Sequence, residues 1–268
     1  MFDYAQIREY RAEDVPTLKK LWFNCLGDGE EITAAFFEHL RGMGTGFAAV
    51  RCGRIIGMAF VLFAELRSAD LKRKDKVAYI YAVAVEEAHR RHGVGAALTQ
   101  ECIRFSRERG AESVCTLPAS EKLYEWYEAV GDMKFTLCCE YEEVQASDEP
   151  AEINELEADE YGWRRDDLLT GKPHVHFLYS FLQFQEALCH ACGGGLYACG
   201  DGIACGYVDD GVLYVKEAIG DTPGFVPALC RHLGAQKAVV RRSSDDAEPF
   251  ICSDNPLPCG TVWNIALD

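Results

Sequence analysis

The stretch VEEAHRRHGVGAALTQ, residues 85–100, decides the fold. An apolar segment typical of a buried strand ends at Val85, and an amphipathic segment with helical spacing follows the glycines. Between these segments lie two arginines, a histidine and two glycines, within residues 90–95. Positive side chains and bare backbone at a helix N-terminus are typical of a site for an anion, such as a phosphate or a pyrophosphate.

Two common nucleotide-binding motifs do not fit this stretch. A dinucleotide-binding fingerprint needs a third glycine, where this chain has Leu98. A P-loop needs Gly-x-x-x-x-Gly-Lys-Ser/Thr, and no such segment occurs in the sequence. The anion site therefore belongs to another class of protein.

Strand and helix patterns alternate around this stretch and predict an α/β fold with a mostly parallel sheet. The predicted strands are residues 7–11, 47–50, 55–66, 77–85, 113–117 and 135–141. The predicted helices are residues 12–26, 32–40, 94–109 and 124–130.

A second unit is predicted to follow a solvated acidic segment and to begin near Tyr161. GLYACGDGIACGY (195–207) aligns without a gap with GFAAVRCGRIIGM (46–58), which indicates an internal repeat. Helices are predicted at 175–192 and 225–233, with strands at 212–219, 237–241 and 261–266. IGDTPGFVPAL (219–229) stands where the anion motif would be, so only the first unit keeps that site.

The first unit resembles the GNAT family of N-acetyltransferases, whose hallmark is Gln/Arg-x-x-Gly-x-Gly/Ala after a strand that ends in Val. YIYAVAVEEAHRRHGVGAALTQ (79–100) fits this pattern, and LPASEKLYEWYEAVGDMKF (117–135) resembles the downstream family helix with its tyrosine, here Tyr127. Ser120 stands in place of the usual Asn, and Gly131-Asp132 replaces Gly-Phe. These departures affect what the resemblance implies about substrate more than about fold. The resemblance covers about residues 5–142.

The resemblance implies a mixed α/β (α+β) sheet of the GNAT acyl-CoA N-acyltransferase fold, in two related domains. We expect a catalytic acetyl-CoA-binding domain at 1–142, an acidic linker at 143–160 and a degenerate GNAT-like domain at 161–268. The activity it implies is direct transfer of an acetyl group from acetyl-CoA, a cosubstrate, to a primary amine of a small molecule or peptide. Tyr127 is the implied acid that protonates the leaving thiolate.

The resemblance also implies the groups that hold acetyl-CoA. Backbone N–H groups of the glycine loop are expected to bind the pyrophosphate, and the strand before it is expected to pair with the pantetheine arm. The implied cofactor-binding residues are Val83, Ala84, Val85, Arg90, Arg91, His92, Gly93, Val94, Gly95, Ala96 and Ser120.

The sequence does not identify the general base. The central strand, where many family members carry an acidic residue, offers two tyrosines instead. A chain of water molecules is an equal alternative. The candidate side chains are Tyr79, Tyr81, Glu65, Asp28, Glu30 and Glu31.

Composition restricts the partners. A net charge of −16 argues against a nucleic-acid partner, whose phosphates need a basic surface. The negative charge either keeps the protein soluble or attracts a cationic amine. Thirteen cysteines without an export signal indicate reduced thiols in a cytoplasmic protein. No apolar run suggests a membrane span. Four cysteines have a spacing similar to that of zinc sites, but they fall at apolar positions, so no metal is expected. They are Cys189, Cys192, Cys199 and Cys205.

Two other functional classes compete with the enzyme. A non-catalytic acyl-CoA-binding or regulatory protein would keep the fold and the anion site without turnover, and the degenerate second unit favours this reading. A purely structural or partner-binding protein would not bind CoA. The sequence is compatible with a homodimer.

Overall fold

The computed structural model describes residues 5–147, 149, 151–220 and 224–268. Their contacts divide the chain into two compact units that are not consecutive in sequence. Unit 1 consists of the described parts of Met1–Glu65, Asp75–Thr136 and Ile251–Leu257, and unit 2 of those of Leu66–Lys74, Leu137–Phe250 and Pro258–Asp268. The acidic linker expected at 143–160 is therefore not a separate segment between the two units.

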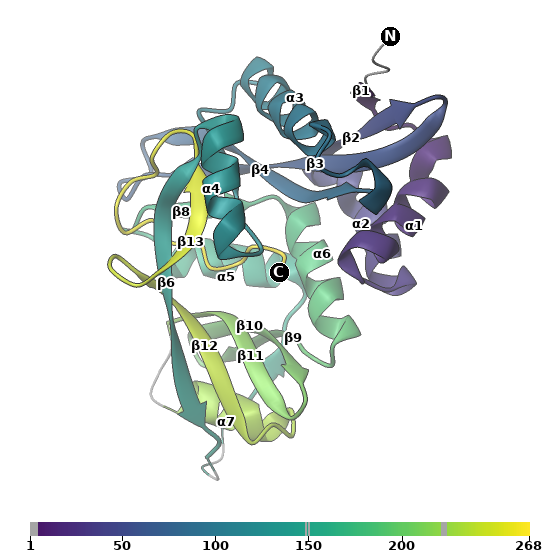
Figure 1. The fold of residues 1–268 in the computed structure, drawn as a ribbon. Helices are drawn as coiled ribbons and strands as arrows, with labels where there is room; N and C mark the ends of the chain where they lie inside the picture. Colours follow the sequence, from purple (N-terminus) through teal and green to yellow (C-terminus); the bar gives the residue numbers. More distant parts are fainter. Residues whose placement is uncertain (1–4, 148, 150, 221–223) are drawn as a thin grey trace. The chain divides into compact units, whose positions relative to one another are not determined.

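Unit 1 is built on a sheet whose strands follow the order β1-β2-β3-β4-β5-β13 (Figure 1). Most of its elements come from the first half of the chain: β1 (Gln6–Glu9), η1 (Ala12–Asp14), α1 (Val15–Leu26), α2 (Glu30–Met43), β2 (Gly44–Arg51), β3 (Arg54–Arg67), β4 (Lys74–Val85), η2 (Glu87–His89), α3 (Val94–Glu108), β5 (Ser113–Thr116) and α4 (Glu121–Gly131). Strand β13 (Glu248–Ser253) joins the edge of β5 from far along the chain, through Cys252 and Ser253.

The prediction of a mostly parallel sheet is wrong. Strands β1 and β2, β2 and β3, and β5 and β13 pair antiparallel, whereas β4 and β5 pair parallel. The direction of neighbouring strands depends on how they are connected. A tight turn such as Cys52-Gly53 joins antiparallel strands, whereas a parallel pair needs a crossover such as α3. In unit 1, the β4–α3–β5 segment has that form.

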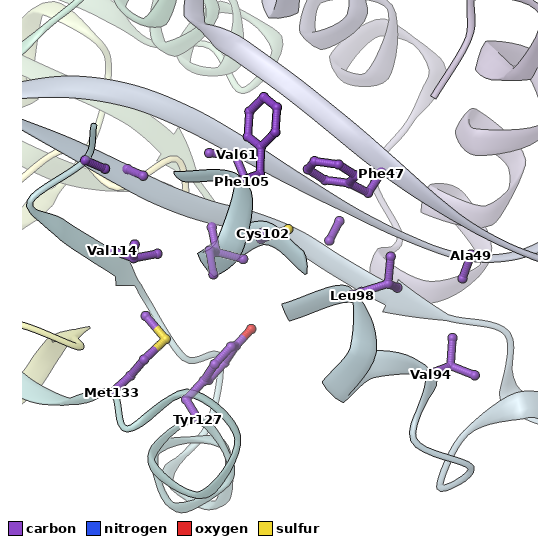
Figure 2. Packing of buried hydrophobic residues seen from close by; sticks show 14 of the residues in the cluster. Phe47, Ala49, Val61, Val94, Leu98, Cys102, Phe105, Val114, Tyr127 and Met133 are labelled. Atoms are coloured by element: carbon purple, nitrogen blue, oxygen red, sulfur yellow. The ribbon is translucent and has the colours of Figure 1, made fainter. Parts of the chain in front are cut away.

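Helices cover both faces of this sheet. On one face, α3 and α4 pack on a cluster that includes Phe47, Leu98 and Phe105, and Tyr127 reaches into the same cluster from α4 (Figure 2). On the other face, Trp22 of α1 and Phe36 of α2 make close aromatic contacts with each other, with ring centroids 4.7 Å apart. The two hydrophobic layers hold β4 between helices, so its backbone position is fixed from both sides.

Unit 2 has a sheet in the order β6-β12-β11-β10-β9-β7 (Figure 1). Its elements are β6 (Lys134–Gln145), β7 (Asn154–Glu155), α5 (Ala158–Leu168), β8 (His174–Phe177), α6 (Tyr179–Ala191), β9 (Gly195–Cys199), β10 (Gly202–Asp209), β11 (Val212–Ile219), α7 (Phe225–His232) and β12 (Lys237–Ser244). Helix α7 packs on one face of the sheet through Phe225 and Leu229.

Unit 2 repeats the strand pairings of unit 1. Strand β7 pairs antiparallel with β9 as β1 does with β2, and β9 with β10 as β2 does with β3. Strand β11 then pairs parallel with β12 across α7, as β4 does with β5 across α3. The order of helices and strands predicted from the glycine pattern is therefore present twice.

Three local predictions in the second half are wrong. Residues 174–177 form strand β8, and the helix predicted from residue 175 begins at Tyr179. Within the segment predicted as a linker, β6 continues to Gln145 and α5 begins at Ala158, although residues 148 and 150 lie outside the described part. The strand predicted at 261–266 is reduced to one bridge between Val262 and His174, because backbone groups further along pair with side chains instead.

Candidate active site

The loop between β4 and α3 has a backbone shaped to bind an anion. After β4 ends at Val85, Arg91 adopts φ +60° and Gly93 adopts φ +81°. Left-handed residues in such a turn direct successive N–H groups to one side, and anions bind in the concavity. Gly93 is the N-cap of the 15-residue helix α3 and makes no side-chain cap bond. The first-turn N–H groups of α3 therefore lack a side-chain cap and suit an external acceptor.

The charged residues of this loop divide into two roles. Arg90 donates from Nε to the carbonyl of Val85 at 3.0 Å, and the Nδ1 of His92 lies 2.7 Å from the carbonyl of Arg90. These contacts fix the loop against the end of β4. Arg91 is exposed and makes no ion pair within the described part of the chain, which makes it the cation most suited to an incoming phosphate.

Nearby acidic charge is partly neutralised. Glu86, at the start of the loop, lies 3.6 Å from Arg54 and 3.7 Å from the ring of His89. An anion at the N-terminus of α3 therefore meets less repulsion than the sequence charge of −16 suggests.

Gly95 places the loop against α4. A Cβ built at Gly95 would lie 3.6 Å from the indole of Trp126 and 3.8 Å from Val85. These are ordinary contact distances, so packing alone does not demand glycine here. The contact with Trp126 brings the helix of Tyr127 to the glycine loop.

Strand β4 has an irregular backbone just before the loop. Ala82 has φ +51°, which is uncommon for a residue with a side chain. Pairing of β4 with β5 extends from Val77 and Ser113 to Tyr79 and Cys115. Beyond that point the Thr116 hydroxyl donates to the carbonyl of Ile80 at 3.0 Å. A side chain replaces the backbone ladder where the two strands separate.

Tyr127 reaches this separation point from α4. Its side chain is buried, and in Figure 2 the hydroxyl points from α4 into the cluster, toward α3. Burial raises the pKa of Tyr127, which interacts with the Thr116 side chain, to about 12. A phenol with this pKa keeps its proton at neutral pH, as an acid for a leaving thiolate requires.

Ser120 occupies the N-cap of α4, with φ −162° and no side-chain cap bond. The glycine loop, Ser120 and Tyr127 lie in the same unit, on or next to α3 and α4. Thr116 was missed by the sequence interpretation. No sequence signal marks it, because a threonine in a short buried strand is an ordinary β-residue.

The candidate bases lie in other surroundings. Tyr79 and Tyr81 stack with ring centroids 6.1 Å apart, and Tyr81 contacts Trp22 on the α1–α2 face. Asp28 accepts a hydrogen bond of 2.7 Å from the indole of Trp22, so it fixes the turn between α1 and α2.

Asp28 and Glu30 also line a surface hollow of about 740 Å³ beside α1, whose lining does not include Tyr127. Glu31 is exposed in the first turn of α2, and Glu65 is half-buried near the end of β3. The geometry does not single out one of the candidate bases.

The cysteines that invited a zinc site are free thiols. Sulfur atoms of Cys189 in α6 and Cys205 in β10 lie 3.7 Å apart in the core of unit 2, whereas Cys192 is exposed. Within the described ranges, no group of three or more His, Cys, Asp or Glu side chains is arranged to hold a metal ion. None of the helices in the described residues combines the length and apolar character of a membrane span.

Comparison with known proteins shows what the part of the chain around this site is similar to. Residues 9–131, which include the glycine loop and Tyr127, match the model of the acetyltransferase (GNAT) family. This part of the chain is therefore similar to the acetyltransferase (GNAT) family. A search of curated proteins found none that matches the chain.

Solved structures show that the fold extends over both units. A GCN5-related N-acetyltransferase from Kribbella flavida superposes with a TM-score of 0.66 at 16% identity, over 93% of this chain and 71% of that one. One from Anabaena variabilis gives 0.67 at 11% identity, over 93% and 72%. A Pyrococcus horikoshii protein gives 0.61 at 15% identity, over 98% and 92%. The mixed α/β fold is thus that of GNAT acyltransferases.

Proposed function

We propose that unit 1 transfers an acetyl group from acetyl-CoA to a primary amine of a small molecule or peptide. The observation that carries this proposal is the pairing of an uncapped helix N-terminus, with Arg91 and Gly93 in left-handed conformations, and a buried protonated Tyr127 on the neighbouring helix. The first feature suits a pyrophosphate and the second suits a leaving thiolate.

The residues present fit acetyl-CoA as cosubstrate. N–H groups from Arg91 to Ala96 would hold the pyrophosphate, and Arg91 would add a charge-assisted bond. The end of β4 from Val83 to Val85 would bind the pantetheine arm, although the Val85 carbonyl already accepts from Arg90. The bound cosubstrate supplies an activated acetyl thioester.

The chemical roles of the chain follow from these positions. Tyr127 would donate its proton to the sulfur as the carbon–sulfur bond breaks, and Thr116 holds its hydroxyl at the point where β4 and β5 separate. The amine nitrogen forms the new bond to the acetyl carbon and releases a proton to solvent, with no residue assigned as the base. Tyr127 then regains a proton from solvent, which balances the proton that the amine releases.

Unit 2 fits a degenerate copy of the same domain, which is the second part of the proposal. Its pairings repeat those of unit 1, but only five residues separate β11 from α7, compared with eight between β4 and α3. Those five residues, 220–224, contain no lysine or arginine, although 221–223 lie outside the described part. We therefore expect one CoA site per chain.

Calorimetric titration with acetyl-CoA and CoA tests the cosubstrate site. Gly93→Asp keeps a good N-cap residue but places a carboxylate where the anion would bind, so it should abolish binding. Gly110→Asp is the matched control, because Gly110 has φ +82° and equally open surroundings at the other end of α3. Binding by the parent and by the Gly110 variant, together with no binding by the Gly93 variant, supports the site.

Other outcomes separate the alternatives. A well-folded parent without saturable binding of acetyl-CoA contradicts the proposal and favours a fold used for contacts. Saturable binding with no release of CoA thiol, across a panel of primary amines, favours a non-catalytic acyl-CoA-binding protein.

A further inference from the structure

Two buried cations meet at one carboxylate in unit 2. Lys216 of β11 is 5% exposed and Arg241 of β12 is 6% exposed. The Nζ of Lys216 lies 3.0 Å from Oδ1 of Asp268, and the guanidinium of Arg241 binds both carboxylate oxygens, with Nη1 3.1 Å from Oδ1. Such a fork-to-carboxylate arrangement is a specific geometry for recognising a carboxylate.

The position of these cations follows from the sheet. Parallel pairing of β11 and β12 extends to Val215 and Val240, whose side chains face α7. Lys216 is the next residue, and it is left out of the pairing with β10, which jumps from Val215 to Glu217. Lys216 therefore lies where the pairing of β11 with β12 ends.

Tyrosines form the walls around the cations. Tyr207 and Tyr214 stack with ring centroids 5.4 Å apart, and Lys216 lies 5.1 Å from the ring centre of Tyr207. Tyr141 lies on the other side, 5.9 Å from Arg241. Together they enclose a hollow of about 220 Å³, which we name the tyrosine pocket; it is lined by Tyr141, Tyr207, Tyr214, Lys216, Arg241 and Asp268.

The charges of the tyrosine pocket are not balanced. The side chains of Lys216 and Arg241 carry two positive charges, and the side chain of Asp268 carries one negative charge. In addition, the Nε of Arg241 is buried and has no hydrogen-bond partner among the described residues. A buried donor without a partner is destabilising, and excess positive charge is unusual in a chain with net charge −16. Both features are relieved by an additional anion.

We propose that the tyrosine pocket binds a small dicarboxylate. One carboxylate takes the place of Asp268 between Lys216 and Arg241, and the second neutralises the remaining positive charge near Arg241 Nε and the tyrosine hydroxyls. Asp268, whose side chain is one-third exposed, turns into solvent. The hollow is below the roughly 300–1,000 Å³ of pockets for drug-sized ligands, so the ligand is small. This site does not depend on the proposed acetyl transfer.

Binding of succinate to the full chain, followed by calorimetry and tyrosine fluorescence without acetyl-CoA, tests the proposal. We expect saturable binding by the wild type and about tenfold tighter binding by Asp268→Asn, which removes the competing carboxylate. Glu140→Gln is the matched control, because it removes the same charge from an exposed position of β6 next to Tyr141. It should leave succinate affinity unchanged. Acetate should bind more weakly than succinate, since it carries one charge.

A second pair of variants keeps the test decisive. Lys216→Gln in the Asp268→Asn background should abolish binding while thermal unfolding shows that the protein remains folded. If that variant does not fold, Arg241→Lys, which keeps the charge but loses the fork, should weaken binding instead. No saturable binding by folded Asp268→Asn up to about 10 mM succinate, a concentration that would detect even millimolar affinity, overturns the proposal. Equal tightening in Glu140→Gln also overturns it.

Discussion

Tyr127 and Thr116 form a hydrogen bond at the point where β4 and β5 separate. Thr116 donates its own proton to the carbonyl of Ile80, so the threonine joins the central strand to the tyrosine. Both side chains are buried, which gives the phenol one defined direction. The proposed acid is thus held by the same strand whose irregular backbone is proposed to bind pantetheine.

Replacing Tyr127 with Phe should separate chemistry from binding. The ring remains in its hydrophobic cluster, so affinity for acetyl-CoA by calorimetry should stay within about twofold of the wild type, whereas kcat should fall about 100-fold. Tyr124→Phe, on the same helix, is the control and should change neither quantity. A parallel loss of affinity and kcat in Tyr127→Phe would argue for a structural role.

The raised pKa of Tyr127 makes a prediction about pH. With a pKa of about 12, the tyrosine is protonated throughout the range from about pH 6 to pH 10. The ratio of kcat between the wild type and Tyr127→Phe should therefore be constant across that range, whatever other groups titrate. A ratio that declines with a midpoint near about pH 8 would show that the phenol ionises much more easily than its burial implies.

Thr116 should act as a positioning residue. Thr116→Val keeps the shape but removes the hydroxyl, and loss of one hydrogen bond worth about 1 kcal/mol predicts a kcat about fivefold lower. The KM for acetyl-CoA should not change, because Thr116 makes no expected contact with the pyrophosphate. Thr116→Ser restores the hydroxyl and should recover kcat to within about twofold. Failure of serine to rescue would indicate that packing, not hydrogen bonding, is what matters.

Local patterns predicted the elements of unit 1 well. The motif at residues 90–95 fixes a strand–loop–helix junction by its chemistry, and the following helix has a clear apolar face. Strand direction was mispredicted because it depends on how each connection folds back, which periodicity does not contain. The contribution of β13 to the sheet of unit 1 was also missed, since pairing over more than 130 residues leaves no local signal.

In the second half of the chain, the sequence pattern does not indicate which charged residues are paired. The acidic segment was interpreted as a solvated linker, yet Arg165 in the adjoining helix α5 is 1% exposed and pairs with Glu217 of β11 at 2.7 Å. A charged residue in a polar segment is usually exposed, so only the fold reveals its partner. The helix predicted from residue 175 also conceals a contact, because His176 lies in strand β8 and its Nδ1 is 2.8 Å from Asp166 of α5.

The buried pair of Arg165 and Glu217 should dominate the stability of unit 2. Glu217 also accepts a hydrogen bond of 2.9 Å from Tyr161, and Arg165 donates to the carbonyl of Val175. Glu217→Gln would leave the guanidinium uncompensated, and we expect the free energy of unfolding in urea to fall by about 3 kcal/mol or more. Glu140→Gln, at an exposed position, should change it by less than about 0.5 kcal/mol. A small effect at Glu217 would show that water reaches this pair.

Asp268 should make stability depend on pH in the acidic range. Burial raises the pKa of Asp268, but the charges of Lys216 and Arg241 outweigh burial and lower it from 3.8 to about 2. A carboxyl with a lowered pKa stabilises the folded state fully above pH 3.8, and this contribution disappears as the pH falls toward 2. Because a third of the side chain is exposed, we expect Asp268→Asn to lower the free energy of unfolding by only about 1 kcal/mol at pH 7. The wild type and the variant should converge by about pH 2, measured by urea unfolding at each pH. A difference that stays constant from pH 7 to pH 2 would mean that Asp268 contributes through packing and not through its charge.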